Sequence, residues 1–280
     1  MHERPEASFP LTSEKRRLIT ELAWFFLLAY GISWALWGII IALKLSAAPG
    51  RSATGRALYF SGIQGPCLAA IILSWFHGGR TEVKAFFKRI VRPPFNLGWL
   101  AIALLAFPAI YLASTWAAVA TGYAAWPHPL IVKPPMGWLG LLWGQALIMF
   151  GEEYGWRGFA LPRLELALGT VGGALVLGIL WAFWHLVLFY TSGSWQAGSL
   201  TVYVAATVAS CMVQAMIFFR ANQSVLAAML YHGALNASQF TMDVPSATAH
   251  YLPLVWSVAL VIALLMMPRP WFRWSAGVEG

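Results

Sequence analysis

The feature that most constrains this chain is a series of apolar runs, each about 17 to 24 residues long and nearly free of charge. A helix needs about 20 apolar residues to cross a hydrocarbon core about 30 Å thick. We therefore expect one transmembrane helix for each run, which predicts an all-α, polytopic membrane protein with about eight spans. The runs cover residues 22–43, 57–76, 98–121, 137 to the Glu152–Glu153 pair, 170–190, 200–219, 224–240 and 251–267.

The composition supports the same fold class. Only 10% of the residues are charged and the mean hydropathy is +0.68, whereas about a quarter of the residues of a soluble domain are charged. So few charges cannot cover a surface that faces water, so we expect the outer surface to contact membrane lipid. The 16 Trp residues suffice for aromatic belts at both membrane interfaces.

The basic residues predict the orientation of the chain. If the N-terminus is cytoplasmic, fourteen of the eighteen Lys and Arg residues fall in cytoplasmic segments, as the positive-inside rule requires. We therefore expect an integral protein of the plasma membrane with both termini cytoplasmic. The positive charges lie between apolar runs rather than on one soluble face, so no nucleic-acid partner is expected.

Three regions follow from the spans. Residues 1–135 form an N-terminal region with three transmembrane helices and a basic cytoplasmic loop over 77–97. Residues 136–240 form a second region, which carries the motifs described below. Residues 241–280 form the last span and a cytoplasmic tail.

Polar groups at membrane depth are costly, and are therefore usually paired or functional. The first such group is Glu152-Glu153 followed by Arg157. Glu153 and Arg157 are four residues apart and share a helix face, so Arg157 can neutralise one carboxylate and leave the other reactive. The alternative is that both glutamates mark the cytoplasmic end of a span, but the apolar residues that follow favour the first interpretation.

The second and third groups lie in later spans. His185 is surrounded by apolar residues, and taken alone it is equally consistent with a buried core histidine. His232 and Asn236 are four residues apart and so lie on one helix face, where they also suit a helix-packing hydrogen bond. A shared site for Glu152, His185, His232 and Asn236 gives each costly polar group a partner, which favours a common site over isolated core positions.

Two other residue types do not join this predicted site. Cys67 and Cys211 lie inside apolar runs without a CxxC motif, so we expect them to be buried core thiols. The remaining histidines are terminal or interfacial: His2, His77, His128 and His250.

The order Glu152-Glu153-x-x-x-Arg157, then aromatic-x-x-x-His185, then His232-x-x-x-Asn236 resembles the CPBP family. This family contains the CAAX prenyl proteases of type II and bacteriocin-processing or self-immunity proteins, and eight helices is its usual architecture. The resemblance covers residues from about 136 to 240. One departure is Trp181, at a place where the family usually has Phe; we expect it to act as a packing aromatic.

The resemblance implies an intramembrane endopeptidase. Glu152 with His185 would activate a water molecule, His232 and Asn236 would stabilise the oxyanion, and Glu153 with Arg157 would support the site. The family has been described both as metal-independent glutamate proteases and as metalloproteases. No cofactor is therefore certain, and a divalent metal such as zinc, with Glu152, His185 and His232 as ligands, stays an alternative.

The expected substrate is a membrane-associated protein or peptide, and a prenylated C-terminal peptide is the class cleaved by the family's eukaryotic members. Two other functions compete with proteolysis. A non-catalytic scaffold or bacteriocin-immunity protein would act by binding a partner, but it has no need of all four site residues. A proton-coupled transporter would need a second acidic residue along an outward path, and the spans contain none beyond Glu152 and Glu153.

One point of geometry is left open by the sequence. A helix that starts near Thr170 on the cytoplasmic side places His185 about 22 Å along its axis, deeper than Glu152 or His232. Either this helix begins outside the bilayer or it is tilted.

Overall fold

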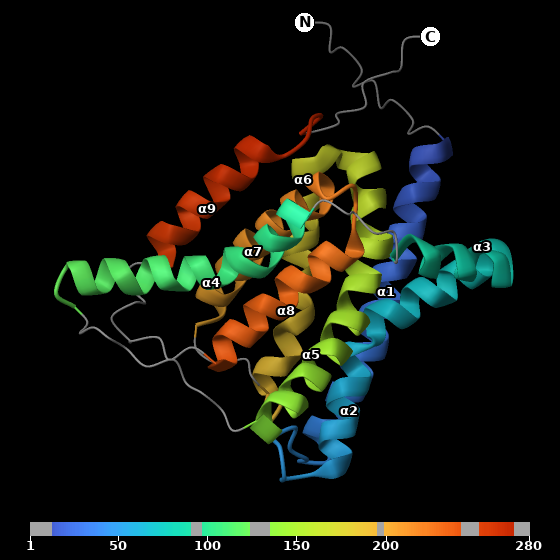
Figure 1. The fold of residues 1–280 in the computed structure, drawn as a ribbon. Coiled ribbons are helices and arrows are strands. Elements are labelled where there is room, and N and C mark those ends of the chain that lie inside the picture. Colours follow the sequence, from blue (N-terminus) through green and yellow to red (C-terminus); the bar gives the residue numbers. More distant parts are fainter. Residues whose placement is uncertain (1–12, 91–96, 124–134, 195–198, 242–251, 272–280) are drawn as a thin grey trace, which may run out of the picture.

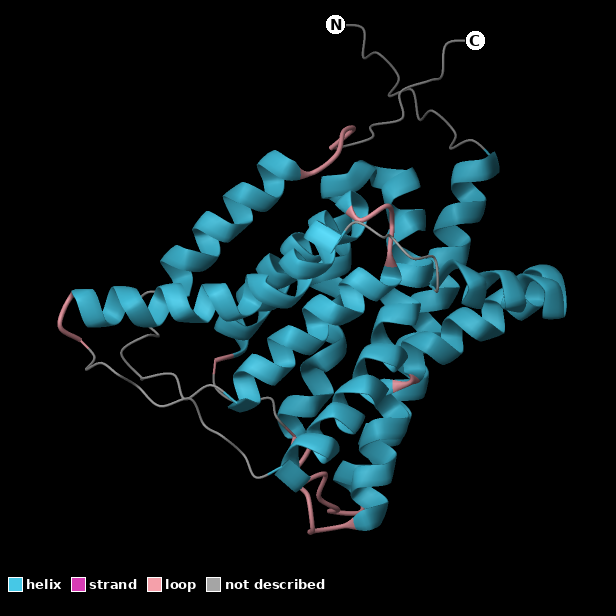
Figure 2. Ribbon diagram, viewed as in Figure 1, coloured by secondary structure: helices cyan, strands magenta, loops and turns pink. Residues whose placement is uncertain are grey.

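The computed structural model describes residues 13–90, 97–123, 135–194, 199–241 and 252–271. Within these residues the chain consists of helices joined by short loops, and no strand is present (Figure 2). The elements are α1 (Ser13–Ala42), α2 (Ala53–Ile63), α3 (Gly65–Ile90), α4 (Leu97–Ala120), α5 (Pro135–Gly155), the π-helical turn η1 (Trp156–Ala160), α6 (Leu161–Trp184), the 3₁₀ turn η2 (His185–Tyr190), α7 (Leu200–Arg220), α8 (Val225–Thr241) and α9 (Leu252–Met266).

Each predicted apolar run coincides with a helix or a pair of helices. The second run is the exception in shape, because it is broken into α2 and α3, which are bent by 48° relative to each other. The break lies next to Pro66, in the first turn of α3, where proline is tolerated because its missing N–H has no helical partner. Part of the predicted basic loop is also helical, since α3 extends past the non-helical residues Gly78 and Gly79 to Ile90. Residues 91–96 and the predicted tail over 272–280 lie outside the described residues.

The segment from α5 to η2 folds back on itself. The π-helical turn η1 links α5 to α6 without a loop, and α6 is interrupted at Gly169, whose φ of +81° is a left-handed conformation that favours glycine. A Cβ atom on Gly173 would lie 2.9 Å from the Leu164 carbonyl carbon and the Glu165 amide nitrogen. The part of α6 after Gly169 therefore packs closely against the part before it.

The predicted count of eight spans is not confirmed. Among the described residues, four helical segments are long and apolar enough to cross a membrane, or five if the bent pair α2 and α3 is one span. The continuous segment 142–190 is counted once although it folds back at Gly169, while α8 and α9 have only 17 and 15 residues.

The surface of the helical bundle is apolar, as expected for an integral membrane protein. Large hydrophobic side chains point outward on several helices, including Phe76 on α3, Trp116 on α4 and Leu265 on α9, which are exposed by 80%, 70% and 71%. A water-soluble protein rarely exposes so many large apolar groups. Together with the long apolar helices, these side chains show that the protein is embedded in a membrane.

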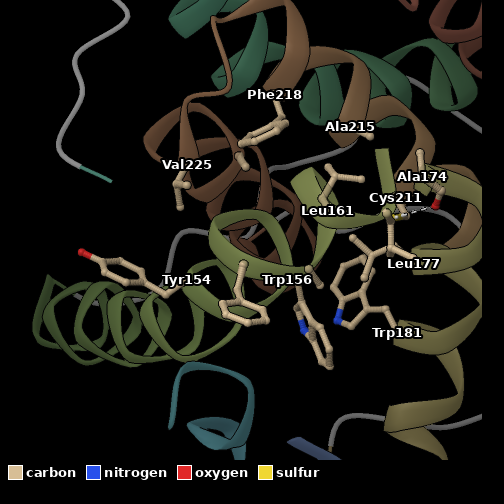
Figure 3. Packing of buried hydrophobic residues seen from close by; sticks show 14 of the residues in the cluster. Tyr154, Trp156, Leu161, Ala174, Leu177, Trp181, Cys211, Ala215, Phe218 and Val225 are labelled. Atoms are coloured by element: carbon tan, nitrogen blue, oxygen red, sulfur yellow. Dashed lines mark hydrogen bonds between the residues drawn. The ribbon is translucent and has the colours of Figure 1, made fainter. Parts of the chain in front are cut away.

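The hydrophobic core extends through the helical bundle, and α6 packs against α7 within it. Leu177 and Trp181 of α6 lie beside Cys211 of α7 (Figure 3), and the Cys211 Sγ atom lies 3.6 Å from the Ala174 carbonyl oxygen. A second close contact joins α5 to α3, because a Cβ atom on Gly155 would lie 2.4 Å from Pro66. Both cysteines are buried free thiols, as predicted. These contacts fix the end of α5, which carries the two glutamates.

Candidate active site

A cavity of about 410 Å³ lies between the helices of the bundle. The four residues predicted to be catalytic all line it: Glu152 from α5, His185 from η2, and His232 and Asn236 from α8. Half of the other lining side chains are aromatic, and they come from α2, α4, α6, α7 and α9: Tyr59, Phe107, Tyr111, Trp181, Trp184, Tyr203 and Trp256. The cavity therefore combines a few convergent polar groups with an apolar wall, as small-ligand and substrate sites do.

The fold-back at Gly169 accounts for the position of His185. The main leg of α6 starts after this glycine and ends at Trp184, and His185 opens the 3₁₀ turn that follows. This geometry brings His185 to the same cavity as Glu152 and His232, so the difference in depth expected from a helix starting near Thr170 does not separate them.

The two neighbouring glutamates have different surroundings. Glu153 is fully buried and does not line the cavity, whereas Glu152, only 3% exposed, does. Glu153 Oε1 lies 2.9 Å from Arg157 Nη1, the pair that the four-residue spacing indicates, and 2.7 Å from His232 Nδ1. Because an ionised carboxylate only accepts hydrogen bonds, the His232 Nδ1–H donates to Glu153, and Nε2 is the ring nitrogen left over.

Arg157 is held from three sides in the π-helical turn. Its Nη1 donates to Glu153, its Nη2 donates to the Cys211 sulfur at 3.4 Å, and its guanidinium carbon lies 4.6 Å from the centre of the Trp181 ring. An arginine over the face of a tryptophan is attracted by the negative potential of the ring. The sequence does not reveal the contact with Cys211, because it joins residues that are 54 positions apart.

Trp181 is more than the packing aromatic expected from the sequence. Its indole Nε1–H donates a hydrogen bond of 2.7 Å to Glu152 Oε2, a bond that the phenylalanine usual at this place in the family cannot make. One signal was present in the sequence: a buried indole N–H needs an acceptor, and few acceptors other than the backbone lie at this depth. Glu152 is the carboxylate that Arg157 leaves unpaired.

The hydrogen bond of His185 assigns its tautomer. Its Nδ1 lies 2.8 Å from the carbonyl oxygen of Trp181, and a carbonyl oxygen can only accept. Nδ1 therefore carries the hydrogen, and in the neutral imidazole the other ring nitrogen, Nε2, is an acceptor. The cavity wall thus presents two acceptors, the Glu152 carboxylate from α5 and His185 Nε2 from η2.

The zinc alternative can be tested against the side chains that could bind the metal ion. Among the residues that the structure describes, no three His, Cys, Asp or Glu side chains are close enough together to hold a metal ion. Glu152 also accepts from Trp181, and His232 donates Nδ1–H to Glu153. The two histidine hydrogen bonds are compatible with zinc, because a metal-binding histidine usually donates its other ring N–H to a carboxylate or a carbonyl. The zinc alternative therefore stays a prediction.

The fold and the cavity define an all-α integral membrane protein with a buried site of carboxylate and imidazole groups. Comparison with known proteins narrows this class. Residues 133–238, which include all six residues predicted for the site, match the family model described as type II CAAX prenyl endopeptidase Rce1-like. The chain is also 20% identical over 235 residues to a CAAX prenyl protease 2 of Methanococcus maripaludis, covering 80% of this chain and 86% of that protein. Both matches support the resemblance to the CPBP family of CAAX proteases that the motifs indicate.

Proposed function

We propose that this protein is an intramembrane endopeptidase that hydrolyses a peptide bond with a water molecule activated by Glu152 and His185. The observation that carries the proposal is that Glu152, His185, His232 and Asn236, which come from three separate elements, line one shared cavity. The family match and the name of the archaeal relative support proteolysis as the reaction class. The division of the chain at residues 135 and 240 stays a prediction.

The hydrogen bonds support a role for each acceptor. Trp181 occupies Glu152 Oε2, so Oε1 is the oxygen left for a water molecule, and His185 presents Nε2 as an acceptor. A water that donates one hydrogen to each group directs a lone pair away from both, towards a substrate carbonyl carbon. Transfer of a proton from the water to Glu152 or His185 as the C–O bond forms is general base catalysis.

The other two residues are proposed to act on the developing negative charge. When the water attacks, the carbonyl oxygen becomes an oxyanion, and donors already in place stabilise it. Asn236 donates from its amide, and His232 in its imidazolium form donates from Nε2 while Nδ1 stays bonded to Glu153. Collapse of the tetrahedral intermediate then breaks the C–N bond, and the proton taken from water is passed to the leaving amine.

The proposed substrate is a membrane-associated protein or peptide, because the cavity lies within the apolar bundle and is walled by aromatic side chains. Lipidated peptides, prenylated ones included, have the required apolar surface. We further propose that both termini face the cytoplasm. The N-terminal end of α1 and the C-terminal end of α9 lie at the same end of the bundle (Figure 1), which agrees with the basic residues of the cytoplasmic segments.

The proposal is tested with purified protein in detergent and a panel of lipidated, prenylated and unmodified peptides, each with and without a chelator. Wild-type protein should cleave at least one peptide, and Glu152→Ala and His232→Ala should abolish cleavage. Glu14→Ala, which removes an exposed carboxylate from the first turn of α1, is the control and should cleave like wild type. Cleavage by Glu152→Ala at the wild-type rate would disprove the site. Inhibition by chelator that zinc reverses would favour the metalloprotease alternative, and a stable wild type that only binds peptides would favour the scaffold or immunity protein.

A further inference from the structure

Trp181 stands at the centre of the site although no motif requires a tryptophan there. It is 4% exposed, and its side chain lines the cavity. It contacts Glu152 through the indole N–H at 2.7 Å and His185 through its backbone carbonyl at 2.8 Å. Its ring lies under the Arg157 guanidinium at 4.6 Å and meets His232 edge to face, with the ring centres 5.4 Å apart. One residue therefore touches four of the six residues predicted for the site.

We propose that Trp181 is a positioning residue that fixes the carboxylate of Glu152 for water activation. This inference rests on the proposed function and deepens it. With Oε2 held by the indole, the carboxyl group of Glu152 is restrained about its last torsion angle, and Oε1 is kept as the oxygen that meets the water. A hydrogen bond to a charged acceptor is shorter and stronger than a neutral one, and the distance of 2.7 Å agrees with this.

The same residue couples the two acceptors of the proposed water. The carbonyl of Trp181 fixes the Nδ1–H tautomer of His185, while its side chain fixes Glu152. The rate of hydrolysis depends steeply on the placement of these two acceptors, because a misplacement of about 1 Å can lower a rate about 100-fold. The backbone bond survives substitution of the side chain, so a substitution at this position isolates the indole bond to Glu152.

The test is Trp181→Phe, which removes the N–H and keeps an aromatic ring. Loss of the hydrogen bond should lower kcat about 10- to 100-fold and leave KM within about 2-fold. The matched control is Trp156→Phe: Trp156 is fully buried, does not line the cavity, and its Nε1 has no hydrogen-bond partner in the described part of the chain. Its substitution should leave kcat unchanged. Equal kcat values for Trp181→Phe and wild type would overturn the inference.

A second substitution separates the hydrogen bond from packing. Incorporation of β-(3-benzothienyl)alanine at position 181 replaces the indole N–H with sulfur and keeps the shape of the ring. The inference predicts that this variant retains the thermal stability of the wild type but shares the low kcat of Trp181→Phe. A purely structural role predicts wild-type kcat for this variant, and that result would overturn the inference.

A third measurement does not depend on cleavage and keeps the inference testable if the proposed function fails. In protein labelled with nitrogen-15 at the indole positions, the Trp181 resonance is identified by its loss in Trp181→Phe. Glu152→Ala removes the acceptor and should shift the Trp181 indole proton upfield, while the Trp156 resonance stays in place. An unmoved Trp181 resonance would overturn the inference. A shift in a protein that cleaves no peptide would support the hydrogen bond and count against the proposed protease.

Discussion

The Glu153 carboxylate lies 2.7 Å from the His232 imidazole Nδ1, and this contact ties the end of α5 to the middle of α8. The same carboxylate oxygen also binds Arg157, which is fully buried. Glu153 therefore holds a buried cation and orients a cavity residue without reaching the cavity itself. Its neighbour Glu152 reaches the cavity and has no ion pair at or below 4.0 Å within the described residues. Substitution of Glu153 should therefore lower the stability of the protein, whereas substitution of Glu152 should lower its activity.

Glu153→Gln should lower the free energy of unfolding by about 3 kcal/mol, because loss of one partner leaves the buried charge of Arg157 uncompensated. Thermal unfolding in detergent measures the change. Glu152→Gln is the matched control: it should abolish cleavage and keep the unfolding temperature of the wild type. Equal unfolding temperatures for the two variants would contradict the division of roles between the glutamates.

Asn236→Ala should lower kcat about 100- to 1000-fold through loss of an oxyanion donor, with little change in stability. Ser238→Ala provides the comparison on the same helix, since the Ser238 hydroxyl donates to the carbonyl of Ala234 in its own helix and does not line the cavity. Steady-state cleavage assays of both variants suffice. If Asn236→Ala matched Ser238→Ala in kcat, the assignment of Asn236 as an oxyanion donor would be wrong.

Gly155→Ala should destabilise the protein by about 1–3 kcal/mol. The added Cβ would lie 2.4 Å from the carbonyl carbon of Pro66, so α3 and α5 would have to separate. Gly144→Ala is the control on the same helix, because its Cβ would meet only Phe60 Cζ at 3.8 Å. Alanine also favours the helix over glycine, so this control should unfold at the wild-type temperature or above it. A Gly155→Ala protein as stable as wild type would contradict the packing of α3 on α5.

Thr170→Val should lower the free energy of unfolding by about 1 kcal/mol, because the buried hydroxyl of Thr170 donates to the carbonyl oxygen of Pro268 at 2.6 Å. The backbone N–H groups of Thr170 and Val171 also donate to the chain beyond α9, at the carbonyls of Pro270 and Trp271. This segment thereby satisfies donors at the start of the main leg of α6, which lack helical partners. Removal of residues 268–280 should destabilise the protein more than Thr170→Val does, and the reverse order in thermal unfolding would contradict the capping role.

Apolar runs and residue spacing in the sequence predict structure within a helix, but they do not predict contacts between helices. The apolar runs predict most helix ends to within a few residues, but α1 and α6 begin earlier and α3 ends later than the runs, because charged residues extend these helices. The spacing of Glu153 and Arg157 indicates their pairing, because this signal acts within one helix. The bond from His232 to Glu153 joins residues 79 positions apart, and no periodicity encodes it. The fold-back at Gly169 was also missed, since a glycine just before an apolar run does not reveal a left-handed conformation.

The sequence predicted which polar side chains share the cavity, but not the hydrogen bonds between them. The motifs name the four cavity residues, because ionisable groups at membrane depth are few. They do not show that Trp181 holds Glu152, since the resemblance to the family favours a packing aromatic at that position. The physical signal was the indole N–H, which needs an acceptor in an apolar core.

The most direct test of the account is a single-turnover cleavage assay in water labelled with oxygen-18, with wild-type protein in excess over its best peptide. The account predicts one oxygen-18 atom in the new carboxyl terminus of the product, no label in the protein segment that contains Glu152, and no product from Glu152→Gln. Label in the carboxylate of Glu152, or product formed by Glu152→Gln at the wild-type rate, would contradict a water molecule activated by this residue.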